Sequence, residues 1–224
     1  MKRNPQKPAA NRAKPPAAAE RKSTPLLVLI SAPSGAGKTT LVNLLLKAQP
    51  HVVRVITCTT RKPRPGEKEG VDYYFLTAAD FLRRLQAGKF IEHATVFGNS
   101  YGILKSELLQ KLRAGQDVLL NVDVQGAATI RGQAAADPEL ARALVTIFLT
   151  TTSLTVLAER LNKRGKDAEA VVQKRLAVAR QEISQWSNFD YLVISGSKAE
   201  DLRRALAIIE AEKMRSGRSA APDF

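Results

Sequence analysis

A chain of 224 residues, with 44% hydrophobic and 25% charged residues, is long enough for one well-packed globular core. Its apolar runs are far shorter than the roughly 18 residues that a membrane-spanning helix needs, and its basic N-terminus leads into Pro and Ala rather than into the apolar stretch of a signal peptide. The formal net charge of +14 is the unusual figure, and it indicates anionic partners, among which nucleotides count as well as nucleic acids.

Residues 1–24 are predicted to form a disordered basic tail. They hold seven basic residues and one acid and almost no large apolar side chains, so they cannot bury enough surface to offset the entropy lost on ordering. The tail contributes +6, which leaves +8 for the remaining 200 residues. A solvated tail without catalytic consequence is the favoured interpretation, and weak, non-specific contact with nucleic acid is the alternative.

Residues 25–217 are predicted to form one α/β domain, followed by a C-terminal tail over 218–224. Short apolar runs alternate with amphipathic helical stretches, which indicates a parallel sheet with helices on both faces. The stretch 57–103 breaks this rhythm with several Pro and Gly residues and an alternating strand, and we interpret it as a lobe inserted into a core made of the rest. The predicted strands are 26–31, 54–58, 71–76, 118–122, 145–149 and 191–194, the predicted helices are about 38–48, 77–87, 103–114, 154–163, 168–187 and 198–215, and the core is assigned to 25–56 and 104–217.

Several helix ends carry recognisable signals. Thr77, Ser153 and Ser197 stand where a side chain can cap the first turn of the following helix. Gly88 and Gly115 stand where a helix ends in a left-handed residue.

The first predicted strand runs into the sequence Ala-Pro-Ser-Gly-Ala-Gly-Lys-Thr at 32–39, and a helix begins at once. This is a phosphate-binding loop with Ala in place of the usual first Gly: the glycines let backbone N–H groups turn toward phosphate oxygens, and the helix N-terminus adds partial positive charge. Lys38 is expected to reach the β- and γ-phosphates, and the Thr39 hydroxyl can hold Mg²⁺. The expected ATP-binding residues are Ala32, Pro33, Ser34, Gly35, Ala36, Gly37, Lys38, Thr39 and Thr40.

The inserted lobe and the segments after it resemble the guanylate kinase family. The matching motifs lie at 57–67, 70–73, 90–92, 98–102 and 123–126, in the order and spacing of that family, and the resemblance covers about 26–215. It implies a P-loop kinase core, a GMP-binding lobe over 57–103 and a helical lid at about 153–175. The GMP-binding residues that it implies are Thr57, Arg61, Arg64, Tyr73, Glu92, Tyr101 and Asp123.

The chemistry of these residues suits GMP. A monophosphate dianion favours the bidentate forks of Arg61 and Arg64, with the Tyr73 hydroxyl and that of Tyr101 completing the cage. Guanine presents two adjacent donors on its pairing edge, which a carboxylate such as Glu92 or Asp123 accepts, whereas adenine offers an acceptor there.

The stretch 159–165 and the pair 174–175 resemble the lid of the same family. Phosphoryl transfer needs alignment, Mg²⁺ and cations around the transferred group, which these arginines can supply when the lid closes. The expected catalytic residues are Lys38, Arg61, Arg160, Arg164 and Arg175, and the expected metal contacts are Thr39 and, through water, Asp123.

Three positions depart from the family pattern. Asn121 replaces an acid near the Mg²⁺, Ile103 replaces a hydroxyl residue expected to touch guanine, and Ser195 opens a Ser-Gly pair where Asn-Asp is usual near the adenine ring.

The resemblance implies transfer of the terminal phosphoryl group of ATP to GMP and dGMP, in purine nucleotide metabolism. One alternative is a related module that keeps the fold and binds phosphorylated peptides in the lobe; another is a P-loop kinase of a phosphorylated sugar. A basic nucleic-acid-binding protein fits less well, because only 5% of the residues are aromatic and stacking platforms are not evident.

The remaining composition points to the cytoplasm. A single cysteine, Cys58, excludes an internal disulfide and fits a reducing compartment. His51 and His93 are interpreted as surface or packing residues, and no spacing resembles a zinc site. ATP and GMP are the expected partners, no membrane contact is expected, and the chain is expected to be a monomer or a homodimer.

Overall fold

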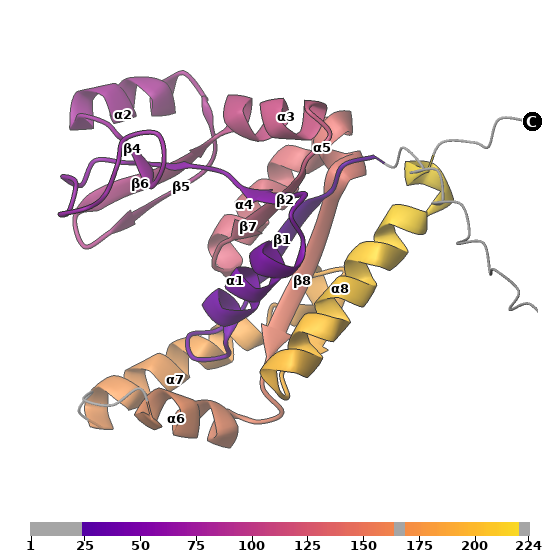
Figure 1. The fold of residues 1–224 in the computed structure, drawn as a ribbon. Helices are drawn as coiled ribbons and strands as arrows, with labels where there is room; N and C mark the ends of the chain where they lie inside the picture. Colours follow the sequence, from indigo (N-terminus) through magenta and orange to yellow (C-terminus); the bar gives the residue numbers. More distant parts are fainter. Residues whose placement is uncertain (1–23, 164–168, 220–224) are drawn as a thin grey trace, which may run out of the picture.

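The computed structural model describes residues 24–163 and 169–219, and its elements form two sheets surrounded by helices (Figure 1). The predicted α/β class is confirmed. In chain order the elements are β1 (Leu27–Ser31), α1 (Lys38–Ala48), β2 (Val52–Arg54), β3 (Thr57–Thr59), β4 (Tyr73–Phe75), α2 (Ala78–Gln86), β5 (Phe90–Val96), β6 (Asn99–Leu104), α3 (Lys105–Arg113), β7 (Asp117–Asn121), α4 (Val124–Ala135), α5 (Pro138–Ala143), β8 (Leu144–Thr150), α6 (Leu154–Lys163), α7 (Glu169–Ile183), the 3₁₀ turn η1 (Trp186–Asn188), β9 (Tyr191–Ile194), α8 (Lys198–Met214) and the 3₁₀ turn η2 (Ser216–Arg218).

The larger sheet is parallel throughout, with the strand order β2-β7-β1-β8-β9. Its central strand β1 is fully buried, and alternate side chains enter two different cores. Val28 and Ile30 pack with α1, α6 and α8, whereas Leu27 and Leu29 pack with α3, α4 and α5. This double burial explains why the strand is a continuous apolar run rather than an alternating one.

The smaller sheet forms the inserted lobe, with the strand order β4-β3-β6-β5. Its own small core consists of Cys58, Phe81 and Phe90, with the two phenylalanine rings stacked at 4.6 Å. Gly102 on β6 is needed here, because a Cβ atom at this position would lie 2.8 Å from the Phe90 ring.

The predicted helix signals are confirmed at five positions. The side chains of Thr77, Ser153 and Ser197 accept hydrogen bonds from backbone N–H groups in the first turns of α2, α6 and α8. Gly88 and Gly115 take the left-handed conformation, with φ of 62° and 81°.

The prediction of one strand over 54–58 was wrong. The run is divided between β2, in the parallel sheet, and β3, in the lobe. The division falls at Ile56, whose N–H donates to the buried carboxylate of Glu107 at 2.9 Å rather than to a neighbouring strand. The sequence pattern did not predict the hairpin of β5 and β6 or the helices α4 and α5.

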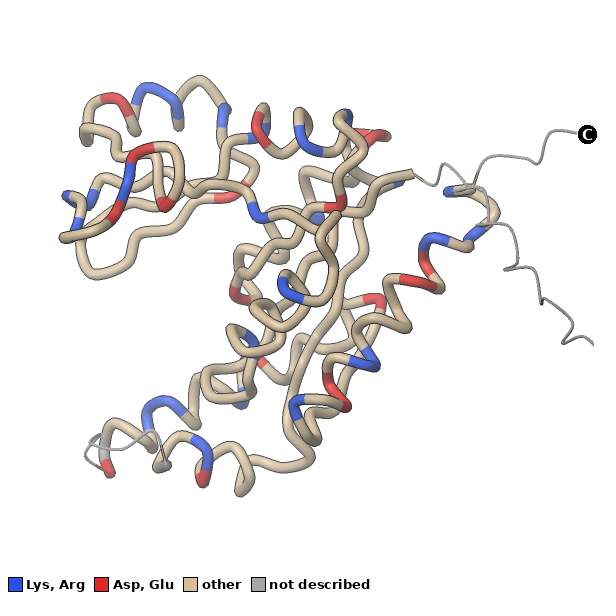
Figure 2. The backbone as a smooth tube through the Cα atoms, in the orientation of Figure 1, with Lys and Arg blue, Asp and Glu red and all other residues tan. Residues whose placement is uncertain are grey.

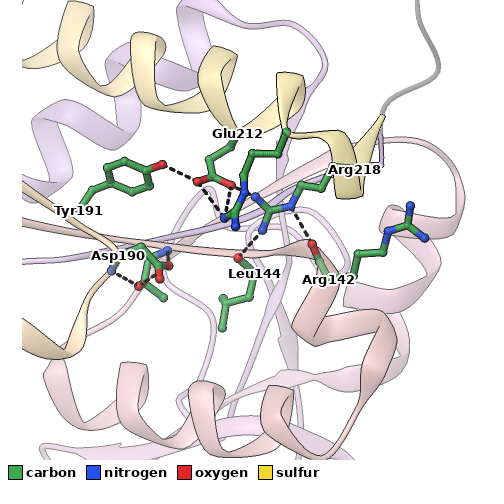
Figure 3. Close-up of polar contacts among 8 residues, drawn as sticks. Arg142, Leu144, Asp190, Tyr191, Glu212 and Arg218 are labelled. Carbon is green, nitrogen blue, oxygen red and sulfur yellow. Dashed lines mark hydrogen bonds and ion pairs between the residues drawn. The ribbon is translucent and has the colours of Figure 1, made fainter. Parts of the chain in front are cut away.

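The C-terminal part of α8 and the turn η2 are fixed to the core by an arginine. Arg218 is 8% exposed; its Nε donates to the carbonyl of Arg142 at 2.8 Å and its Nη2 to that of Leu144 at 2.9 Å (Figure 3). It also pairs with Glu212, which accepts from the Tyr191 hydroxyl. Arg218, expected as the first residue of the C-terminal tail, therefore lies within the folded body. Among the helices of the described ranges, none has the length and apolar character needed to cross a membrane.

Candidate active site

Four strands of the parallel sheet end at one edge, and each is followed by a segment with polar side chains. The phosphate loop follows β1, Asp123 follows β7, the lid helices follow β8, and Ser195 follows β9. The carboxyl ends of parallel strands are the usual position of a ligand site in such sheets, because the connecting loops meet there.

The phosphate loop has the conformation that its glycines allow. Gly35 and Gly37 have φ of 93° and 106°, values that residues with a Cβ rarely adopt. The Ala36 N–H closes the turn on the carbonyl of Pro33 at 3.1 Å, and α1 starts directly after Gly37. The predicted ATP-binding residues 32–39, except Ala36, line a cavity of about 290 Å³ with Glu182.

Lys38 is turned inward at the base of this cavity. Its Nζ donates to the carbonyl of Val122, at the end of β7, at 2.8 Å. Burial lowers the pKa of Lys38, while the carboxylates of Asp123 and Glu182 act in the opposite direction. The ammonium group is thus held among oxygen atoms at the position where phosphate oxygens are expected.

The lid helix α6 rests directly on the phosphate loop. A Cβ atom on Gly35 would lie 2.9 Å from Leu161 and 3.2 Å from Leu157, so a larger residue there would have to displace these two side chains of the helix. Arg160 adds polar contacts, because its Nη1 donates to the carbonyl of Ala36 at 3.2 Å and to the hydroxyl of Ser195 at 2.9 Å. Lys and Arg residues lie along both lid helices, α6 and α7 (Figure 2).

Ser195 joins the lid to α8. Its hydroxyl donates to the carboxylate of Asp201 at 2.7 Å, and the other oxygen of that carboxylate accepts from the N–H of Gly196 at 2.8 Å. Arg160, Ser195 and Asp201 line a cavity of about 430 Å³, whose apolar wall is formed by Leu41 and Leu44. From the sequence, Ser195 was identified only as a departure from the family pattern. In the structure its hydroxyl links Arg160 of α6 to Asp201 of α8 in the lining of this cavity.

In the lobe, the structure brings together three of the predicted acceptor residues. Arg61 lies over the ring of Tyr73 at 5.3 Å, and the rings of Tyr73 and Tyr101 meet edge to face at 6.2 Å. The Nη2 atom of Arg61 also donates to both carboxylate oxygens of Glu67, at 2.8 and 3.0 Å. Glu67, which the sequence analysis did not select, therefore fixes the direction of the Arg61 fork.

Two other predicted acceptor residues border this cluster. The backbone N–H of Arg64 donates to Glu67 at 2.8 Å, but its exposed guanidinium group has no partner among the described residues. Thr57 lines a hollow of about 280 Å³ with Tyr73 and Asp72.

Glu92 and Asp123 lie together where the lobe meets the core. Glu92, on β5, packs against Gly126 in the first turn of α4, where an added Cβ atom would lie 3.2 Å from its Oε1. Asp123 caps the same turn, because its Oδ1 accepts from the N–H of Gly126 at 2.8 Å. Burial, and next the charge of Asp123, raise the pKa of Glu92 to about 7. The two carboxylates expected to bind guanine, Glu92 and Asp123, are therefore adjacent. One oxygen of Asp123 is already bonded to the N–H of Gly126.

The other predicted residues have simpler positions. Arg175 lies exposed on α7, whereas Arg164 falls outside the described residues. Asn121 is exposed at the end of β7, and Ile103 is buried in the core beside α3 and α4. The hydrogen bond that a hydroxyl at 103 would make is replaced here by apolar packing.

Glu182, on α7, also belongs to this site, although it was not among the residues predicted from the sequence. It lines both the phosphate cavity and a neighbouring cavity of about 320 Å³ that includes Asp123. Its Oε2 is buried without a hydrogen-bond partner in the described part of the chain. Burial raises the pKa of Glu182, against the attraction of Lys38 and a hydrogen bond from the Ser34 backbone. The sequence does place Glu182 three residues after Ala179, which is buried. Residues three apart lie on the same face of a helix, and this spacing was the signal that could have indicated burial of Glu182.

Comparison with known proteins gives one consistent result. The family model described as guanylate kinase matches residues 24–212. A guanylate kinase of Coxiella burnetii is 43% identical over 188 residues, which are 84% of this chain and 88% of that protein. One of Alcanivorax borkumensis is 45% identical over 199 residues, with 87% and 91% covered. The crystal structure of guanylate kinase from Anaplasma phagocytophilum superposes with a TM-score of 0.67 at 32% identity, covering 91% of this chain and 94% of that one.

The raised pKa of Glu92 predicts a pH-dependent cost in stability without substrate. Between the ordinary carboxyl pKa of 4.5 and about 7, the folded state binds more protons at Glu92 than the unfolded state does, so stability falls as pH rises through this window. Glu92→Gln lacks this charge, and we expect it to be more stable than the parent by about 2–4 °C in melting temperature above pH 7, with the difference vanishing near pH 4.5. Parallel melting curves from pH 4.5 to 8 measure it; a constant difference would refute the burial of this charge.

Proposed function

The chain belongs to the guanylate kinase family, and from this membership we infer that it transfers the terminal phosphoryl group of ATP to GMP, giving ADP and GDP. One observation carries the inference further: the Nζ of Lys38 donates to the carbonyl of Val122, the residue before Asp123, and Glu92 packs against Gly126, whose N–H donates to Asp123. The donor phosphate site and the carboxylates proposed to read the base therefore border one short segment, so that two nucleotides bound there would be neighbours, as direct transfer between them requires.

We propose that the adenosine of ATP occupies the cavity of about 430 Å³ and that its phosphates continue into the cavity of about 290 Å³. Gly35 and Gly37 line both cavities, which makes them contiguous. The apolar side chains of Leu41 and Leu44 suit the face of a base, and backbone N–H groups of the loop suit phosphate oxygens.

The acceptor GMP is proposed to bind between the lobe and the core, with its phosphate facing the γ-phosphate of ATP. Glu92 accepts from guanine N1–H and N2–H₂, assisted by the Asp123 oxygen that does not cap α4. Arg61, Tyr73 and Tyr101 bind the phosphate, with the exposed fork of Arg64 and the Thr57 hydroxyl completing the cage. dGMP presents the same base edge and the same phosphate, so we expect it to be an acceptor too.

In the transfer step an oxygen of the GMP phosphate attacks the γ-phosphorus, and the bond to the β–γ bridging oxygen breaks with its electron pair leaving on ADP. Lys38 and Arg160, which already contacts the phosphate loop, are proposed to stabilise the charge on the transferred group. The same role is proposed for Arg61, Arg164 and Arg175. No general base is required, because the attacking phosphate is ionised near neutral pH.

The residues present fit Mg²⁺ bound together with ATP. The described residues contain no cluster of three or more His, Cys, Asp or Glu side chains that would hold a metal alone, and Mg²⁺ in kinases takes most of its ligands from phosphates and water. Thr39 would supply a hydroxyl, and Asp123 would act through water. The ion supplies charge neutralisation of the phosphates.

Two further expectations about the protein's surroundings remain proposals. A cytoplasmic location is supported by the substrates and by the free, buried thiol of Cys58, which fits a reducing compartment. A contact between the basic residues 1–24 and nucleic acid is supported by their seven cations.

The nucleotide preference tests the proposed function directly. In a coupled assay of ADP release with ATP, we expect GMP and dGMP to react at least about tenfold faster than AMP, CMP or UMP, because a mismatched edge leaves a buried carboxylate unpaired at about 1–3 kcal/mol. Glu92→Gln should lower the GMP-over-AMP ratio, because an amide can also donate. Equal rates on AMP would favour a less selective kinase, activity on a phosphorylated sugar would favour a sugar kinase, and phosphopeptide binding without turnover would favour an interaction module.

The variant Lys38→Met tests whether Lys38 acts at the ATP phosphates and not in GMP binding. We expect the variant to lose at least about two to three orders of magnitude in turnover, since the cation at the transferred phosphoryl group is removed. GMP binding, measured by calorimetry, should change less than about threefold, because the lobe contacts are untouched. Near-normal turnover would contradict the assignment of Lys38.

A further inference from the structure

The cavity of about 430 Å³ proposed for the adenosine of ATP lies between α1, the lid helix α6 and the start of α8 (Figure 1). Three of the polar side chains that line it are bonded to one another. The Ser195 hydroxyl accepts from Nη1 of Arg160 at 2.9 Å and donates to one carboxylate oxygen of Asp201 at 2.7 Å. The other Asp201 oxygen accepts from the N–H of Gly196 at 2.8 Å. Ser195 and Asp201 are both buried, so these polar groups are satisfied within the protein before a base enters.

The backbone just after β9 is engaged in the same way. The N–H of Ser195 donates to the carbonyl of Thr150 at 2.6 Å, and the carbonyl of Gly196 accepts from Nη2 of Arg160 at 3.4 Å. Backbone groups in a ligand pocket commonly fix the orientation of the ligand. Here the N–H of Ser195 and both backbone polar groups of Gly196 have partners inside the protein.

Position 196 offers the base no side chain, and its surroundings leave little space for one. A Cβ atom on Gly196 would lie 2.6 Å from Oε2 of Glu200. That carboxylate is paired with Arg204, one turn further along α8, and Arg204 also donates to the carbonyl of Ile194. The segment after β9 therefore closes the cavity with groups that bond to the protein itself.

The other polar side chains of the cavity, in the described part of the chain, are those of Thr40, Ser197 and Lys198. A hydroxyl group can donate or accept, so it suits the 6-amino group of adenine and the 6-oxo group of guanine alike. The exposed ammonium group of Lys198 only donates, and both purines present N7 as an acceptor. Hydrogen bonding in this cavity therefore gives little reason to prefer either purine.

We propose that the donor site does not select between adenine and guanine, so that GTP, like ATP, serves as a phosphoryl donor to GMP. This inference rests on the proposed function and specifies the class of triphosphate that it uses. The side chains of Leu41 and Leu44 suit the face of a purine, which adenine and guanine share, and apolar contact discriminates far less than buried polar groups matched to one edge. In the reaction with GTP, an oxygen of the GMP phosphate attacks the γ-phosphorus and the bond to the β–γ bridging oxygen breaks with its electron pair, so that two molecules of GDP form.

The test measures donor binding while the acceptor site is filled. The β,γ-imido analogues of ATP, GTP and CTP are titrated by calorimetry into the full chain with Mg²⁺ and saturating GMP, so that the GTP analogue cannot occupy the acceptor site. Turnover is measured with dGMP as acceptor, because transfer to it gives dGDP, which chromatography separates from the GDP left by GTP. We expect the GTP analogue to bind within about fivefold of the ATP analogue, and the CTP analogue at least about fivefold more weakly, because a single ring buries less apolar surface.

A pair of leucine variants tests whether the base is held by apolar contact. Leu44→Ala shortens the wall of the cavity, whereas Leu82→Ala shortens a leucine of α2 that is 52% exposed and lies outside the cavity. We expect Leu44→Ala to weaken binding of the ATP and GTP analogues by the same factor, about three- to tenfold, and Leu82→Ala to leave both affinities unchanged. A change of more than about fivefold in the ATP-to-GTP affinity ratio of Leu44→Ala would contradict unselective contact.

The outcomes separate this inference from the proposed function. GTP binding and dGDP formation at least about fiftyfold weaker than with ATP would overturn the inference and leave transfer from ATP to GMP intact. The absence of transfer from ATP to either GMP or dGMP would contradict the proposed function itself, and this inference with it.

Discussion

The absence of a side chain at Gly35 is the constraint on which the donor site depends. Its φ of 93° shapes the phosphate loop, and because it has no Cβ atom, the side chains of Leu157 and Leu161 on α6 pack closely against it. Because α6 lies this close, Arg160 can reach the loop carbonyl and Ser195 together. The larger cavity, its polar rim and the position of the lid all follow from this contact.

The candidate active site also contains buried charged groups that lack complete partners when no substrate is bound. Lys38 is half-buried beside two carboxylates, Glu182 keeps an unpartnered buried oxygen, and Glu92 carries a raised pKa beside Asp123. Groups held this way cost folding free energy, and they are common where a ligand later supplies the missing partners. Guanine donors would satisfy Glu92, and phosphates with their metal would satisfy Lys38 and Glu182. The same groups would then account both for the stability cost predicted at Glu92 and for the proposed preference for guanine.

The sequence predicted best what is encoded locally. The phosphate loop, helix 38–48 and the caps at Thr77 and Ser197 depend on a few neighbouring residues, and the structure agrees with them. Long-range contacts could not be predicted from the sequence. Glu107 accepts from the N–H of Ile56, between β2 and β3, from 51 residues away, and Arg218 donates to carbonyl groups 74 and 76 residues earlier. Helix α4 was missed because its Ala, Gly, Thr and Gln residues give little amphipathic pattern, although Asp123 caps it. Glu182 joins the site only through tertiary packing.

The most direct test of this account is ATP affinity in Gly35→Ala, measured by calorimetry with GMP affinity as the internal control. A non-glycine residue in the left-handed region costs about 1–3 kcal/mol, to which the clash with Leu161 adds, so we predict ATP binding at least about tenfold weaker and GMP binding unchanged. The double variant Gly35→Ala/Leu161→Ala removes the clash but not the backbone strain, and should recover part of the loss. ATP affinity equal to the parent in Gly35→Ala would contradict the claim that the donor site is built on this contact.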